Sequence, residues 1–165
     1  MAATANPSSV APADRVLELT REFDAPRELV FEAWSSPEHL AHWFGPTDFK
    51  LPFCKMDFRV GGRYALIMLS PGGKEYQVHG VYREIVEPQR IVFTWEREGE
   101  DDQDAGHTLI TITLESRGPG RTLLRLHQAT FDTTEIRDSH AGGWKQAFAR
   151  LDEYVEELRI ERTGS

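Results

Sequence analysis

The sequence predicts an α+β fold in which a curved antiparallel sheet of about six to seven strands packs against one long C-terminal helix. Between residues 49 and 129, short apolar segments of strand type are separated by turn residues. After them comes an apolar stripe at helical spacings of four, three, four and three, formed by Trp144, Phe148, Leu151, Val155 and Leu158. Two short helical segments are expected between the first strand and the second.

Length and composition indicate one globular domain. The chain has 165 residues, 39% of them hydrophobic and 28% charged, which is close to the average for soluble domains. Residues 1–13 combine small residues with proline and serine, so we expect a disordered tail. The domain is expected to occupy residues 14–160, followed by a frayed end at 161–165.

The net charge and the number of cysteines limit the kinds of binding partner and the cellular compartment that we expect. The 27 acidic residues exceed the 19 basic ones, and a net charge of -8 disfavours binding to nucleic acid or anionic lipid. Cys54 is the single cysteine, which excludes an intrachain disulfide and a cysteine-based zinc site. The sequence contains neither a spanning run of about 18 apolar residues nor a signal peptide pattern. We therefore expect a cytoplasmic protein without a membrane span.

The first elements follow from local signals. Residues 15–23 alternate imperfectly between apolar and charged positions and predict a first strand. Asp24 is then interpreted as the N-cap of an amphipathic helix whose apolar positions run from Leu29 to Trp34. Ser36 followed by Pro37 predicts the start of a second short helix.

The second helix is predicted to end at Phe44, because Gly45 and Pro46 cannot continue it. Two aromatic side chains, Trp43 and Phe44, stand immediately before this break. Aromatic residues beside a Gly-Pro hinge favour a lid over a pocket, so we interpret this loop as closing one end of the fold.

Strands follow from Phe49 onwards. Tyr64 to Leu69 is apolar on both faces, which indicates a strand that is covered on both sides or lines a cavity. The acidic run at residues 98–104 has no periodicity and is predicted to be a solvated hairpin loop. The predicted strands are residues 49–58, 64–69, 74–86, 91–98, 108–114 and 121–129.

The last helix is expected to begin after Gly143 and to continue to about residue 159. The preceding segment, residues 133–143, carries turn and cap residues, including the pair Gly142 and Gly143. The end of the chain from Ile160 onwards is expected to fray.

Several short motifs along these elements can be compared with those of known families. The sequence resembles the activator of Hsp90 ATPase homologue 1-like family, within the START-like (SRPBCC) superfamily, over nearly all of residues 15–158. No single motif identifies the family, but the order and spacing of the motifs do. The motifs are REFDAP at 21–26, VFEAW at 30–34, WFGP at 43–46, RVGG at 59–62, GVYREI at 80–85, FTW at 93–95 and GGW at 142–144.

The resemblance implies a helix-grip fold, in which the sheet wraps the C-terminal helix and leaves a cavity closed by the two small helices. Members of the superfamily bind or transform apolar molecules such as lipids, hormones and polyketides. The eukaryotic co-chaperone that gives the family its name has a further N-terminal domain that contacts Hsp90. That domain is absent from this sequence, which lowers the expectation of co-chaperone activity.

A ligand-binding cavity is the expected functional site, since such sites are concave and mostly apolar. Each wall residue has the alternative role of filling the core, where aromatic side chains supply much of the volume. His79 is a candidate polar group in the cavity. The predicted wall consists of Trp43, Phe44, Tyr64, Leu66, Met68, Val78, Tyr82, Phe93, Trp95, Trp144 and Phe148.

Other chemistry has weaker support. His39 and His42 could share a helical face, but a metal site needs three or four convergent ligands and no HExxH motif occurs, so no metal is expected. The glycine pairs lie between strands, which disfavours a nucleotide cofactor. His79 and Glu84 are five residues apart on one strand, so regular pleating places them on opposite faces. No catalytic residue is therefore assigned.

The sequence thus favours a domain that binds an apolar or amphipathic small molecule without a cofactor, with a stress-related role as one context. Two alternatives stay open: an enzyme of the cyclase or hydrolase kind built in the same cavity, and a module that contacts an Hsp90-type chaperone. Either a monomer or a homodimer is compatible with the sequence.

Overall fold

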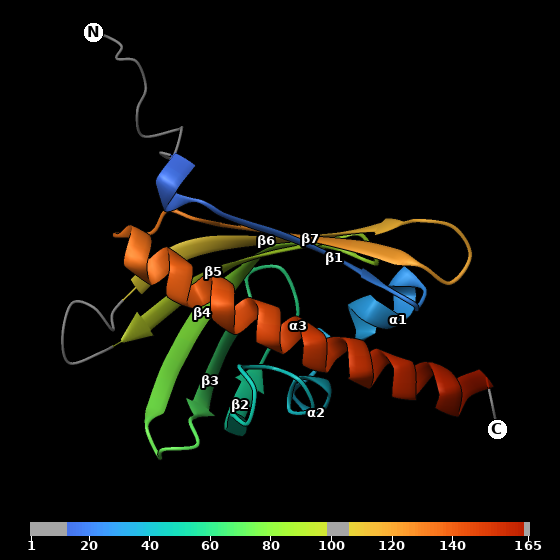
Figure 1. The fold of residues 1–165 in the computed structure, drawn as a ribbon, viewed down its shortest axis with the longest axis horizontal. Helices are drawn as coiled ribbons and strands as arrows, with labels where there is room; N and C mark the ends of the chain where they lie inside the picture. Colours follow the sequence, from blue (N-terminus) through green and yellow to red (C-terminus); the bar gives the residue numbers. More distant parts are fainter. Residues whose placement is uncertain (1–12, 99–105, 164–165) are drawn as a thin grey trace, which may run out of the picture.

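A computed structural model describes residues 13–98 and 106–163, and in it a seven-stranded antiparallel sheet curves around the long helix α3 (Figure 1). The predicted α+β class and helix-grip arrangement are confirmed. The elements are β1 (Leu17–Phe23), α1 (Arg27–Glu32), α2 (Pro37–Leu40), β2 (Lys50–Met56), β3 (Arg63–Leu69), β4 (Glu75–Val86), β5 (Arg90–Glu98), β6 (Gly106–Ser116), β7 (Thr122–Ala129) and α3 (Thr134–Thr163), after a 3₁₀ turn at Ala13–Arg15.

The strand order is β1-β7-β6-β5-β4-β3-β2. Strands β2 to β7 follow one another as antiparallel neighbours, as short connections require. β1 instead pairs with β7, so β1 and β2 lie at opposite edges of the sheet although only α1 and α2 separate them in sequence. The two short helices therefore carry the chain across the concave side, on which α3 also lies (Figure 1).

Buried and more exposed residues alternate along the strands, as expected for a sheet that is covered on one face. On β3, Tyr64, Leu66 and Met68 are buried towards α3, whereas Ala65 and Ile67 on the other face are half-buried. The core is rich in aromatic rings around Trp34, whose ring centroid lies 4.8 Å from that of Trp43. Within the part of the chain described, no helix combines the length and apolar character needed to cross a membrane.

The start of α1 differs from the prediction. Asp24 is exposed and does not cap the helix; the N-cap is Pro26, which has no side-chain hydrogen bond to offer. The predicted cap of α2 is confirmed, since the Ser36 hydroxyl accepts a hydrogen bond from the amide of His39 at 3.2 Å.

α2 ends at Leu40, four residues before the predicted end at Phe44. The intervening residues form turns in which the amides of Trp43 and Phe44 both donate to the carbonyl of Leu40, at 3.1 and 2.8 Å. These turns direct both aromatic side chains into the core before Gly45 reverses the chain with a φ of +104°.

α3 is longer than predicted at both ends. It begins at Thr134, with the Thr133 hydroxyl accepting from the amide of Ile136 at 3.1 Å, so Gly142 and Gly143 lie inside the helix. Helix propensity is a weak signal that the rest of the fold can override, and a Cβ on Gly143 would make only an ordinary van der Waals contact with Pro46, at 3.5 Å. At the other end the helix continues to Thr163. Most of the predicted tail at 1–13 and of the predicted acidic loop at 98–104 lies outside the described residues, as do the last two residues of the end at 161–165 that was expected to fray.

Candidate functional site

An open cavity of about 150 Å³ lies between the first half of α3, the loop that follows α2 and the inner face of β3, β4 and β5. Its depth is formed by buried side chains, namely Phe44, Met68, Trp95, Trp144 and Ala147. Its rim consists of Gly45, Pro46, Phe49, Tyr76, Arg97, Ser139, His140 and Gly143, most of which are half-buried or exposed. The cavity is therefore apolar inside and polar at one side of its mouth.

The loop at the mouth is anchored to α3. Nη1 of Arg150 lies 3.0 Å from each of the carbonyl oxygens of Gly45 and Pro46, and the amide of Thr47 donates to Oε1 of Gln146 at 2.9 Å. A Cβ on Gly45 would lie 3.3 Å from Phe49 and 3.4 Å from the sulfur of Met68. Gly45 thus allows the loop to approach the sheet, and Arg150 holds it against the helix.

A buried amide fixes the orientation of the polar groups beside the cavity. The indole Nε1 of Trp144 can only donate, and it donates to Oε1 of Gln128 at 2.9 Å. Nε2 of Gln128 is then the donor to the Thr108 hydroxyl at 2.8 Å, and it lies 3.5 Å from Nδ1 of His140. Because an amide nitrogen cannot accept, Nδ1 of His140 is the acceptor and the ring proton is on Nε2.

Burial lowers the pKa of His140 from 6.5 to about 4, and the positive charge of Arg97 contributes to the same shift. The imidazole is therefore neutral at physiological pH. Neutral and with its proton on Nε2, His140 is a hydrogen-bond donor at the rim of the cavity.

This shift predicts a dependence of stability on pH. The folded pKa of His140 lies below its unfolded value, so the unfolded state binds more protons between pH 6.5 and about 4, and stability falls as the pH is lowered through that window. At roughly 1.4 kcal/mol per pKa unit, the loss is at most about 3 kcal/mol. Chemical denaturation at pH 7 and pH 4.5 should show a smaller pH effect in His140→Gln than in the wild type, because all other titrating groups are shared. An NMR titration of His140 with a midpoint near 6.5 would contradict the assignment.

The predicted wall residues divide into three groups. Phe44, Met68, Trp95 and Trp144 line the cavity. Tyr64, Leu66, Tyr82 and Phe93 instead surround a separate void of only about 20 Å³ deeper in the core. Trp43, Val78 and Phe148 are fully or almost fully buried and line neither space.

His79, the predicted polar group, does not line the cavity. It is half-buried on β4 between Val78 and Gly80, whose positions face the core, so its own position belongs to the outer face of the sheet. The register pairs it with Ala65 and Glu96.

Several rim residues were absent from the sequence prediction, although some signals for them exist. Arg97 is two residues after Trp95 on the same strand and therefore faces the same side. His140 precedes Trp144 by four residues on α3, which places the two on one helical face. The second signal was hidden because the segment 133–143 was expected to precede the helix.

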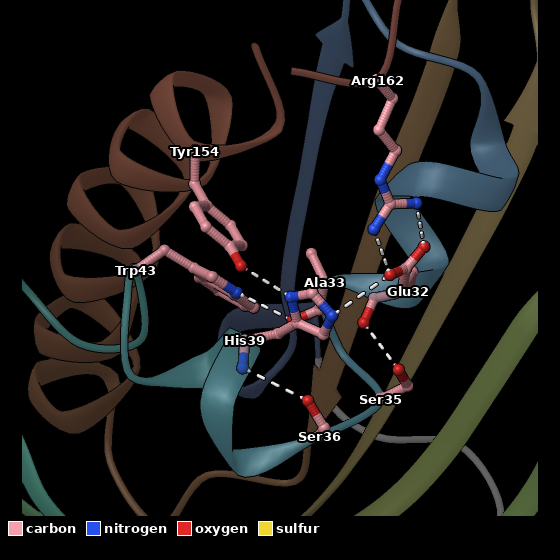
Figure 2. A network of polar contacts seen from close by, with 8 residues as sticks. All are labelled: Glu32, Ala33, Ser35, Ser36, His39, Trp43, Tyr154 and Arg162. Carbon is pink, nitrogen blue, oxygen red and sulfur yellow. Dashed lines mark hydrogen bonds and ion pairs between the residues drawn. The ribbon is translucent and has the colours of Figure 1, made fainter. Parts of the chain in front are cut away.

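A second group of polar residues joins the three helices away from the cavity (Figure 2). The guanidinium of Arg162 forms two hydrogen bonds with the Glu32 carboxylate, at 2.7 and 2.6 Å. His39 lies between Glu32 and Tyr154, with Nε2 3.2 Å from Oε2 of Glu32 and Nδ1 2.6 Å from the Tyr154 hydroxyl. The hydrogen bond from Arg162 is the main cause of the lowered pKa of Glu32. None of these side chains lines the cavity, so we interpret the group as a structural tie between α1, α2 and α3.

Metal and thiol chemistry find little support in the described residues. Across residues 13–98 and 106–163, His, Cys, Asp and Glu form no group of three or more suited to a metal ion. Burial raises the pKa of the Cys54 thiol to about 11, which keeps it protonated and unreactive at neutral pH.

Comparisons with known proteins agree with this architecture. The structure of a protein from Chromobacterium violaceum is similar with a TM-score of 0.73 and 31% identity, covering 86% of this chain and 97% of that one. The activator of Hsp90 ATPase-type protein from Silicibacter pomeroyi gives 0.73 and 28%, with coverages of 88% and 99%. A solution structure from Arthrobacter aurescens gives 0.76 and 25%, with 87% of each chain covered.

At the level of sequence, no significant match was found among curated proteins. The sequence model described as "Activator of Hsp90 ATPase homolog 1-like protein" matches residues 24–156, from the end of β1 to the last third of α3. This range includes both small helices, six of the seven strands and every residue of the cavity. The chain therefore belongs to the activator of Hsp90 ATPase homologue 1-like family.

Proposed function

We propose that this domain binds a small apolar or amphipathic molecule in the cavity between the sheet and the first half of α3. The observation that carries the proposal is the cavity itself: an open space of about 150 Å³ with Phe44, Trp95 and Trp144 in its depth. A ligand that displaces water from this apolar lining gains hydrophobic and dispersion stabilisation.

The volume limits the size of the buried part of the ligand. A space of about 150 Å³ accommodates a molecule of the size of benzene, whereas pockets for larger ligands measure roughly 300 to 1,000 Å³. The deeper void of about 20 Å³ is too small to extend this space. We therefore infer that one aromatic ring or a short aliphatic segment occupies the cavity, with any longer part of the ligand outside its mouth.

The four tryptophans provide a direct test by NMR, because each indole N–H gives a separate signal. Trp95 and Trp144 line the cavity, whereas the indole of Trp43 is buried in the core and donates to the carbonyl of Ala33 at 3.0 Å. Titration with small aromatic compounds such as indole and phenol should shift the Trp95 and Trp144 signals and leave that of Trp43 in place.

A variant that fills the cavity supplies the control. Ala147 is buried in the lining, so Ala147→Phe should remove the shifts by occupying the ligand's space. Ala149→Phe makes the same change on α3 at a position that does not line the cavity, and it should bind as the wild type does. Equal shifts in the wild type and Ala147→Phe, or none in the wild type with any compound of the series, would refute the proposal.

A further inference from the structure

The open cavity has a small neighbour deeper in the core, and one side chain belongs to both. The inner void of about 20 Å³ is lined by buried aromatic and aliphatic side chains. Within the part of the chain that the structure describes, Phe44 alone lines the void and the cavity together. The two spaces are therefore divided at Phe44.

The ring of Phe44 is packed among other aromatic rings at this boundary. Its centroid lies 6.0 Å from that of Trp95 and 5.7 Å from that of Trp144, and both of these residues line the cavity but not the void. The same ring lies 5.4 Å from Trp43, which is buried in the core. Phe44 is thus a wall of the cavity that is held on more than one side.

The backbone that carries Phe44 is fixed independently of the ring. The amide of Phe44 donates to the carbonyl of Leu40 at 2.8 Å, and Nη1 of Arg150 lies 3.0 Å from each of the carbonyl oxygens of Gly45 and Pro46. None of these contacts involves the phenyl group. A smaller side chain at position 44 should therefore open the wall without releasing the loop.

The space behind the wall is suited to an apolar group. Two tyrosines contribute the hydroxyls of its lining, and that of Tyr64 already donates to the carbonyl of Thr94 at 2.6 Å. Burial raises the pKa of the Tyr82 hydroxyl, so this group carries no charge at neutral pH. An alkyl chain that reached the void would exchange water for aromatic and aliphatic neighbours.

We propose that Phe44 sets the length of the ligand by closing the cavity off from the inner void. In the wild type, the buried part of the ligand is then limited to about one ring, and an apolar substituent has to leave through the mouth. This inference rests on the proposed function and adds a specificity-determining residue. It assigns the preference for short ligands to one side chain.

Ethylbenzene and butylbenzene test this limit because they differ by two methylenes and by no polar group. In the wild type, butylbenzene should bind at most about threefold more tightly than ethylbenzene, because the added methylenes stay largely in water. In Phe44→Ala they become buried, and the ratio should rise to roughly tenfold or more. Phe44→Leu removes less volume and should give an intermediate ratio. The affinities can be measured from the shifts of the indole N–H signals.

The position of the alkyl chain is a second and independent readout. In Phe44→Ala, the terminal methyl group of bound butylbenzene should show NOEs to the rings of Tyr82 and Phe93, which line the void but not the cavity. The wild type should show none. Met68→Ala is the matched control, because it shortens another buried wall residue that does not line the void. It should show no NOE to these two rings, even if its wider cavity binds butylbenzene more tightly.

The outcomes separate this inference from the proposed function. NOEs from butylbenzene to Tyr82 or Phe93 in the wild type would show that Phe44 does not close the cavity, and this measurement does not depend on a variant that folds. Wild-type ratios without such NOEs in folded Phe44→Ala and Phe44→Leu would also overturn the inference, while the cavity would still bind ligands. If no alkylbenzene binds the wild type or a variant, the proposed function fails and the role of Phe44 fails with it.

Discussion

Replacing Trp43 with alanine is expected to lower the free energy of unfolding by about 3 to 5 kcal/mol. The side chain is fully buried, its indole donates to the carbonyl of Ala33 at 3.0 Å, and its ring makes edge-on contacts with Trp34 and Phe44 at 4.8 and 5.4 Å. Alanine would leave a large cavity and a buried carbonyl without its donor. Urea denaturation of the variant measures the loss.

Two further variants show which part of the side chain matters. Trp43→Phe keeps most of the ring but removes the N–H, so we expect a loss of roughly 1 to 3 kcal/mol from the unpaired carbonyl and the reduced volume. His42→Ala changes the exposed neighbour and should cost less than about 1 kcal/mol. A loss below about 1 kcal/mol for Trp43→Ala, together with a large loss of affinity for aromatic compounds, would instead support the lid predicted from the sequence.

The architecture could be predicted because its signals are periodic and local. The stripe from Trp144 to Leu158 repeats with the helical period, and all five of its apolar side chains are buried. On the strand at Tyr64 to Leu69, which was expected to be covered on both faces or to line a cavity, only Tyr64, Leu66 and Met68 are buried, and the other face is half-buried. The start of α3 could not be predicted in the same way. Gly142 and Gly143 weaken the helix signal locally, although both lie inside α3.

The position of the cavity depends on volumes that a linear pattern does not contain. Trp34 was left out of the predicted wall, yet its ring centroid lies between 4.8 and 6.4 Å from those of Trp43, Phe93, Trp144 and Phe148. The ring therefore fills the centre where a cavity was expected. The free space is displaced towards the start of α3, a segment that was expected to be a turn. The fold was thus predictable from sequence, whereas the division of the aromatic residues between wall and core was not.

Gly80→Ala is the second change with a large expected effect, a loss of about 3 kcal/mol or more in the free energy of unfolding. A Cβ at Gly80 would lie 2.0 Å from the carbonyl oxygen of Thr94 and 2.7 Å from the ring of Tyr64. The Thr94 oxygen belongs to the backbone of β5 and also accepts a hydrogen bond from the Tyr64 hydroxyl at 2.6 Å, so neither contact can be relieved by a rotation of one flexible side chain. Relief requires separation of β4 from β5.

Thermal and urea denaturation of Gly80→Ala should be compared with Gly72→Ala in the preceding turn, where a Cβ would meet only the Ser70 hydroxyl at 3.9 Å and the change should be nearly neutral. The site should respond as well, because Trp95 directly follows Thr94 on β5 and any displacement of that backbone moves an inner wall of the cavity. In the folded fraction of Gly80→Ala, the Trp95 indole signal should therefore shift even without ligand. The signal of Trp43, whose indole donates to the carbonyl of Ala33 rather than to β4 or β5, should stay close to its wild-type position. A Gly80→Ala protein as stable as Gly72→Ala would mean that the two strands can adjust at this point at little cost, and that the glycine is not needed for their close approach.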